Sequence, residues 1–308
     1  MAIPDDPQQQ LEWEARQRPR AAVSAAVAAL LIFGGQLARG AAFADAPRAG
    51  LLDALDRVRA PGPVGDQPSL QVPAAQYLSD NTASFLIPSI VEGLGFFALA
   101  YALTFLAAAT RARRSQFPRP ALYLPAIGGV LMGTVAIAGA VGRTGDVRSF
   151  LDGDRTVEAA EEIGLGGLSL VAQVAFLPAA LALAAAYVLV ALNAMRAGLL
   201  TRFMGILGVI VGGLTVVQLG PFPVVQTVWL VGLAVLLFGR RPGGDLPAWR
   251  TGREEPWPTS QQVAEQRRAA KGGDAAPQDH NGKPEEAAAV AAGSPPAGEA
   301  KRKRKRRR

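Results

Sequence analysis

Apolar residues in this chain occur in long blocks separated by short polar segments. A helix that crosses a membrane needs about 20 such residues, and a soluble amphipathic helix carries a charge at about every turn. Across the blocks the one ionisable side chain is Glu92. The pattern predicts an all-α polytopic membrane bundle of six transmembrane helices: Ala21–Ala38, Ser84–Thr110, Leu122–Val141, Leu165–Leu192, Phe203–Gln218 and Phe222–Phe238.

Arginine placement predicts the side of the membrane that each loop faces. Arginines cluster before the first span, between the second and third, between the fourth and fifth, and after the sixth. The alternate segments 39–83 and 142–164 together hold seven arginines and eleven carboxylates. We expect both termini in the cytoplasm. The chain then divides into a cytoplasmic segment 1–20, a transmembrane domain 21–239 with an outer cap loop at 39–83, a juxtamembrane segment 240–270 and a disordered tail 271–308.

Two arginines lie inside one long apolar stretch, in the sequence AMRAGLLTR. Arg196 and Arg202 indicate a tight cytoplasmic turn between antiparallel helices, because Gly198 permits a sharp turn and guanidinium groups reach lipid head groups. A buried anion site is the alternative for this pair.

The first span resembles a signal peptide, because an Ala-x-Ala site follows it at Ala42–Ala44. Its 18 apolar residues exceed the roughly 7 to 15 of a signal peptide, and Arg39 precedes the site. We therefore favour an uncleaved first helix.

The outer segments predict short helices. Residues 51–58 carry leucines and a valine on one helical face, which favours a helix in the membrane interface over a lid or docking element. The sequence PAAQYLSD predicts a second short helix before the second span. The acids of the segment 142–164 fit no EF-hand spacing and favour the start of a solvated helix over a metal site.

Composition removes much catalytic chemistry. The chain has no cysteine, its single histidine is His280 in the tail, and its first lysine is Lys271. Thiolate, histidine and Schiff-base chemistry are thereby absent from the membrane core, so we expect no enzyme, no cofactor and no metal.

The formal net charge of +7 comes from the last eight residues. Without them the chain holds 24 basic and 25 acidic residues. On a flexible tail, this run would bind anionic lipid head groups, with nucleic acid or an acidic protein as competing polyanions. The run is Lys301, Arg302, Lys303, Arg304, Lys305, Arg306, Arg307 and Arg308.

Polar residues inside the spans are few. An intramembrane carboxylate usually has a function, so Glu92 is a candidate transport residue, with Gln173 or Gln226 as its partner. The alternative is that Glu92 marks the outer interface. Glycines four residues apart, Gly129 with Gly133 and Gly208 with Gly212, indicate close helix packing.

The stretches LNAMRAGLLTRFMGILGVIVGG and LFGRRPGGDLPAWRTGREEPWP, with LEWEAR near the start, carry a resemblance that covers residues 10–260. Here the chain resembles a family of uncharacterised actinobacterial six-span integral membrane proteins. The resemblance implies a multi-pass protein of the bacterial plasma membrane and brings no activity or site. We therefore expect a non-enzymatic envelope scaffold or regulatory protein, with a small-solute or proton-coupled transporter as the alternative and an intramembrane enzyme as the third choice.

Overall fold

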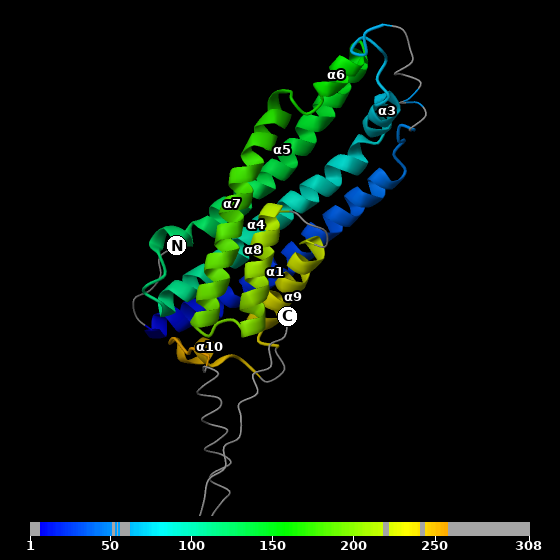
Figure 1. Cartoon of the computed structure of the whole chain (residues 1–308). Coiled ribbons are helices and arrows are strands. Elements are labelled where there is room, and N and C mark those ends of the chain that lie inside the picture. The colour runs from blue at the N-terminus through cyan, green and yellow to red at the C-terminus, as the bar shows by residue number, and fades with distance from the viewer. Residues whose placement is uncertain are drawn as a thin grey trace, which may run out of the picture. The chain divides into compact units, whose positions relative to one another are not determined.

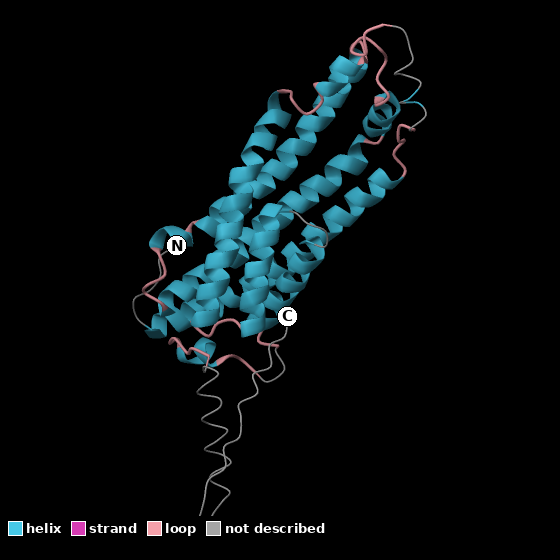
Figure 2. Cartoon of the chain, in the orientation of Figure 1, coloured by secondary structure: helices cyan, strands magenta, loops and turns pink. Residues whose placement is uncertain are grey.

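Long α-helices make up most of this computed structural model (Figure 1). The structure describes residues 7–50, 53, 55, 62–217, 222–240 and 244–257. The chain divides into two units, residues 1–257 and residues 258–308. Every described residue belongs to the first unit. Within that part the chain forms helices and loops without a β-strand (Figure 2). The elements are α1 (Pro7–Ala44), α3 (Val72–Asp80), α4 (Thr82–Arg113), the 3-10 helix η1 (Arg119–Leu122), α5 (Leu124–Asp152), α6 (Val157–Glu161), α7 (Gly167–Arg196), α8 (Arg202–Val217), α9 (Phe222–Leu237) and α10 (Pro247–Thr251).

Four of these helices, α1, α4, α5 and α7, are long and apolar enough to cross a membrane. The helices α8 and α9 are also apolar but contain only 16 residues each. The all-α class is thus confirmed, and each predicted apolar block forms a helix. Four membrane-length apolar helices indicate a membrane-associated protein.

Two helices extend beyond the predicted spans. Helix α1 begins at Pro7 instead of Ala21, because residues 8–18 are mostly good helix formers such as Gln, Leu, Glu, Ala and Arg. Helix α5 continues past Val141 to Asp152, and its last turns bury Val147 and Phe150 against α3 and α6. Tertiary packing therefore lengthens both helices outside the apolar blocks that predicted them.

The helices pack in a chain of antiparallel neighbours. Helix α4 lies against α1 and α5, α7 lies against α5 and α8, and α9 lies against α1 and α8 (Figure 1). The predicted close approach at glycines is confirmed. A Cβ at Gly129 would lie 2.6 Å from the Ala100 Cβ, and a Cβ at Gly212 would lie 3.0 Å from the Ala184 carbonyl oxygen.

The end of the bundle that holds α3 and α6 forms a small cap. The predicted short helix PAAQYLSD is confirmed as α3. Residues 65–69 pair with residues 155–158, through Ser69 N–H donating to the Arg155 carbonyl at 2.8 Å and Val157 N–H donating to the Gln67 carbonyl at 2.9 Å. Two predicted outer loops are therefore joined. The predicted helix at 51–58 lies outside the described residues, apart from Asp53 and Leu55.

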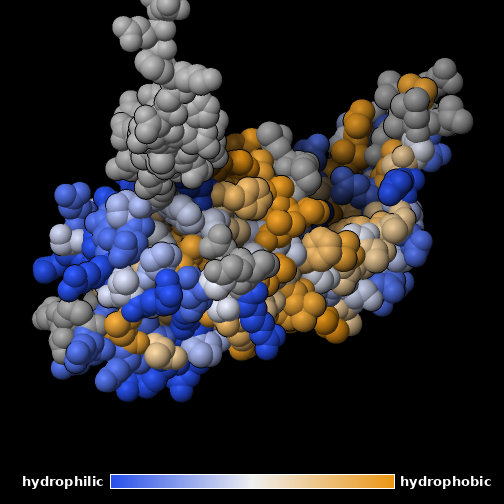
Figure 3. Space-filling model, turned by 90° about the horizontal axis from the view of Figure 1, so that it is seen from below, coloured by the Kyte–Doolittle hydropathy of each residue, from blue (hydrophilic) through white to orange (hydrophobic). Residues whose placement is uncertain are grey.

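Large apolar side chains cover much of the bundle surface. Examples from three helices are Leu30 at 71% exposed, Val174 at 68% and Phe203 at 67%. Figure 3 shows one face, where hydrophilic residues gather at one end and apolar residues occupy the middle. Extensive exposed apolar surface of this kind is typical of contact with lipid or with partner proteins.

Adjacent glycines on α8 provide a test of this packing. A Cβ at Gly212 would also approach a Val188 methyl carbon to 2.8 Å, whereas a Cβ at Gly213 meets nothing within 4 Å. We expect Gly212→Ala to destabilise the protein by about 1–3 kcal/mol, because overpacking forces the helices apart. Thermal unfolding in detergent should give Gly212→Ala a lower midpoint than the wild type and Gly213→Ala a midpoint at or above it. Equal midpoints for the two variants would contradict the packing of α7 on α8.

Candidate functional site

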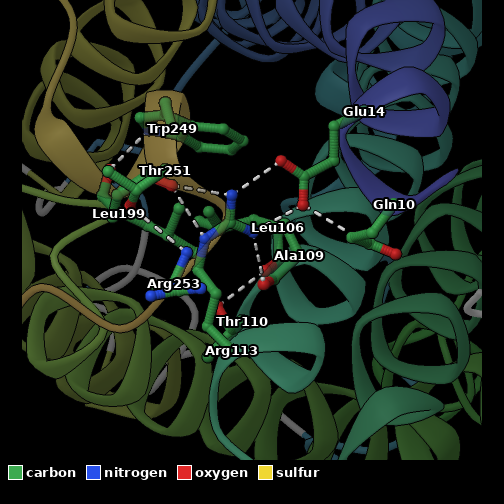
Figure 4. Close-up of polar contacts among 11 residues, drawn as sticks. Gln10, Glu14, Leu106, Ala109, Thr110, Arg113, Leu199, Trp249, Thr251 and Arg253 are labelled. Carbon is green, nitrogen blue, oxygen red and sulfur yellow. Dashed lines mark hydrogen bonds and ion pairs between the residues drawn. The ribbon is translucent and has the colours of Figure 1, made fainter. Parts of the chain in front are cut away.

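A buried ion pair joins the start of α1 to the end of α4. The Arg113 Nη1 and Nη2 atoms donate to the two Glu14 carboxylate oxygens at 2.5 and 2.8 Å (Figure 4). The two side chains are 0% and 3% exposed. Gln10 Nε2 also donates to Glu14 at 2.7 Å. A buried bidentate pair with extra hydrogen bonds satisfies both charges, which is the condition under which such a pair is tolerated.

Arg113 also holds the segment that follows α9. Its Nε and Nη2 atoms donate to the Ala248 carbonyl at 3.1 and 2.9 Å. The Trp249 ring lies 5.3 Å from the Arg113 guanidinium and stacks on Phe105 at a centroid distance of 6.1 Å. One arginine therefore binds α1, α4 and α10 together.

A second ion pair reinforces this junction. Arg18 donates to both carboxylate oxygens of Asp245 at 2.6 and 3.0 Å and to the Leu236 carbonyl at 3.0 Å. Its guanidinium lies 4.7 Å from the Trp249 ring centroid. The hydrogen bonds from Arg18 hold the pKa of Asp245 below its ordinary value. We call Glu14, Arg18, Arg113, Asp245 and Trp249 the helix-end network.

The turn between α7 and α8 joins the same end. Trp249 Nε1 donates to the Leu199 carbonyl at 3.0 Å, and Trp257 Nε1 donates to the Leu200 carbonyl at 2.9 Å. Gly198 has a φ of +78°, and a Cβ there would lie 2.2 Å from the Glu255 carbonyl oxygen. The predicted tight turn with glycine is confirmed, and residues 245–257 cover it.

Glu92 lies away from this network, in the other half of α4. Its side chain is 7% exposed, its Oε2 lies 2.9 Å from Arg39 Nη1, and its Oε1 accepts a 2.9 Å hydrogen bond from Gln36 Nε2. Gly35 permits this contact, because a Cβ there would lie 2.7 Å from the Pro88 carbonyl oxygen and 3.0 Å from Glu92 Cβ. Both partners come from one turn of α1.

Two neighbouring cavities meet at Arg39. One, of about 430 Å³, is lined by Glu92 and Gln36 together with Phe96, Met132 and Thr215. The other, of about 410 Å³, is lined by Gln173, Arg143 and Ser169. Arg39, Val135, Ala136 and Phe176 line both cavities. The two spaces are therefore adjacent, and these four residues lie between them.

The predicted transport residues do not form one group. Gln173 lines the cavity next to that of Glu92. Gln226 is fully buried elsewhere, where its Nε2 donates to the Tyr187 hydroxyl at 3.1 Å. The partners of Glu92 that sequence reasoning missed are Gln36 and Arg39. Gln36 and Arg39 are three residues apart after Gly34 and Gly35, a spacing that puts both polar side chains on one face of a helix. A single sequence does not reveal that this face of α1 meets Glu92 on α4.

Among the described residues, no group of three or more acidic or histidine side chains could hold a metal ion. Comparison of the chain with family models, with curated proteins and with solved structures found no match. The candidate site is therefore interpreted from its geometry alone.

The buried ion pair gives a stability prediction. Glu14→Gln leaves the Arg113 charge buried and unpaired, so we expect a loss of about 3–5 kcal/mol in the free energy of unfolding. The matched control is Glu254→Gln, which removes the 2.8 Å pair with Arg114 in which Glu254 is 40% exposed. That change should cost less than about 1 kcal/mol in detergent unfolding experiments. Similar losses for both variants would refute the central role of Glu14.

Asp245 gives a pH prediction. Because its folded-state pKa is lowered, its contribution to stability is complete above the unfolded pKa of about 4 and is lost as the pH falls through the folded value. The stability difference between wild type and Asp245→Asn should therefore shrink below about pH 4. A pH-independent difference for Asp245→Asn would argue against the Arg18 pair.

Proposed function

We propose that this chain is a non-enzymatic integral membrane protein of a bacterial plasma membrane, acting as a scaffold or regulatory protein. In this proposal it has six spans, with both termini in the cytoplasm. The observation that carries it is the helix-end network, which ties together α1, α4, the α7–α8 turn and the segment 245–257. Because these contacts keep the four segments in fixed positions, the bundle is suited to present a surface of constant shape to partner proteins.

The arrangement of the helix ends supports six spans. The start of α1, the end of α4 and the α7–α8 turn contact the same segment 245–257, as an alternating path through a membrane requires. Arg196 and Arg202 lie at this end, where the positive-inside rule predicts cytoplasm. The 16-residue helices α8 and α9 are about 24 Å long, roughly 6 Å shorter than the hydrocarbon core of about 30 Å, and local thinning of the bilayer accommodates a difference of this size.

The depth of Glu92 supports a role at the outer interface. It precedes Arg113 by 21 residues on α4, which corresponds to about 32 Å along the helix axis. A hydrocarbon core of about 30 Å that begins near Arg113 therefore ends near Glu92. Arg39 is 38% exposed beside it, and a partly exposed guanidinium favours the polar interface over the hydrocarbon core.

A transporter is the second candidate, favoured by a buried carboxylate that borders a cavity. A transporter must open its two ends in turn. Opening the cytoplasmic end would break the Glu14–Arg113 pair and expose Trp249. In addition, Glu92 is engaged by Arg39 and Gln36 and does not contact Gln173 or Gln226 in the described structure. The static interpretation therefore fits the contacts better.

The polybasic run Lys301–Arg308 lies outside the described residues. Its attraction to anionic lipid of the inner leaflet stays a prediction from charge.

The absence of cysteine allows a direct test. We expect Glu92→Cys to react with a membrane-impermeant thiol reagent from outside only, at a rate that an ion gradient does not change. Gln173→Cys repeats the measurement without removing the Glu92 charge, and the exposed Arg196→Cys should react from inside only.

A rate at position 92 or 173 that switches sides with the gradient would establish alternating access and favour the transporter. Outside labelling of position 196 would instead refute the proposed orientation. The two results are independent, so the topology and the static bundle are tested separately.

A further inference from the structure

We propose that the 410 Å³ cavity at the cap end of the bundle binds an anionic amphiphile, a molecule with a phosphate or carboxylate head and an alkyl chain. The cavity lies between α1, α4, α5 and α7, and two arginines, Arg39 and Arg143, line it without any carboxylate among the lining residues. This inference rests on the proposed membrane orientation, which places the cavity near the outer leaflet.

Arg143 gives the cavity its charge. Its side chain is exposed, and no described residue forms an ion pair or hydrogen bond with it. Asp146, one turn further along α5, is engaged by the Gly164 backbone N–H at 3.0 Å. Arg39 retains donors beyond the Nη1 atom that contacts Glu92, since a guanidinium has five N–H groups. The pair is therefore suited to hold an anionic oxygen group.

A buried hydroxyl without a partner indicates that a ligand completes the site. Ser169 is 7% exposed, lines the cavity, and its Oγ has no hydrogen-bond partner among the described residues. Burying a hydroxyl without a hydrogen bond costs free energy, and rotation of the Ser169 side chain toward a ligand oxygen in the cavity would remove that cost. Gly142 fixes its position, because a Cβ there would lie 2.6 Å from Ser169 Oγ.

Aromatic walls favour an alkyl chain over a free anion. Phe43 and Phe85 pack with ring centroids 4.5 Å apart, and Phe176 completes the lining towards the Glu92 cavity. A further cavity of about 360 Å³ shares Phe43, Phe85 and Arg143 and adds Arg48. The open space thus continues past Phe43 and Phe85 toward α3, which gives room for a molecule longer than a small anion. The volume of the main cavity, about 410 Å³, falls within the range of about 300–1,000 Å³ typical of small-molecule sites.

The test is lipid binding to the purified full-length protein, measured by native mass spectrometry in neutral detergent. We expect phosphatidylglycerol to bind at least about tenfold more tightly than phosphatidylcholine, since one charge-assisted contact is worth at least about 1.4 kcal/mol. Arg143→Gln should abolish this preference. Arg148→Gln is the matched control, because it removes an exposed arginine five residues away that lines none of these cavities. Ala140→Phe, which fills the cavity, should reduce binding of both lipids.

Competition separates the possible sources of the anion. Dodecanoate should displace the bound lipid, whereas inorganic phosphate at the same concentration should not, because it has no chain for the aromatic walls. Displacement by phosphate alone would overturn the amphiphile in favour of a free-anion site. Equal affinity for the two lipids, or equal effects of Arg143→Gln and Arg148→Gln, would overturn the site itself. Neither result changes the thiol-labelling pattern, so a failure here is distinguishable from a failure of the proposed function.

Discussion

The ion pair between Glu14 and Arg113 is the constraint on which the rest of the structure depends. Two full charges are removed from solvent, and they are tolerated because each finds several partners at once. To supply those partners, α1 must extend back at least to Gln10, α4 must reach Arg113, and the segment after α9 must return across the bundle. Trp249 then fills the space beneath both arginines of the network. A single electrostatic requirement thereby fixes the relative positions of segments from both ends of the described chain.

The two ends of the bundle consequently differ in character. At the network end, side chains from four segments fill the interior and residues 245–257 cover the turn between α7 and α8. At the cap end, the helices are held by a smaller apolar cluster around Phe85 and Phe150 and by backbone pairing between two loops. The two cavities that share Arg39 and Phe176 lie in this second half, whereas a cavity of about 350 Å³ lined by Arg196, Arg202 and Trp257 lies at the network end. The buried ion pairs of the helix-end network are therefore separated along the axis from the cavities around Arg39.

Block length was sufficient to predict the six apolar helices α1, α4, α5, α7, α8 and α9, because lipid-compatible composition is a local property of the sequence. The same holds for Gly198, where a tight turn between α7 and α8 was expected and occurs. The site was less accessible to prediction. Glu92 could be selected as an isolated acid, but its partners on α1 depend on how Gly35 allows two helices to meet. Gln226 was grouped with it by residue type, and packing instead places it against Tyr187. The Glu14–Arg113 pair joins residues 99 apart along the chain, and no local pattern reveals such a pair.

The unequal helix lengths have a mechanical consequence for the surrounding lipid. Helices α8 and α9 are about 24 Å long, whereas α4 and α7 extend to about 45 Å or more. In the proposed membrane, lipid beside the short hairpin must thin by several ångströms, and lipid beside the long helices need not. Such hydrophobic mismatch costs a fraction of a kcal/mol per ångström. The cost falls when α8 and α9 lie in a thinner part of the bilayer or beside a second pair of short helices. The bundle therefore deforms the bilayer beside α8 and α9 only. This one-sided deformation would favour thinner membrane regions and would favour neighbouring proteins that contact the α8–α9 side.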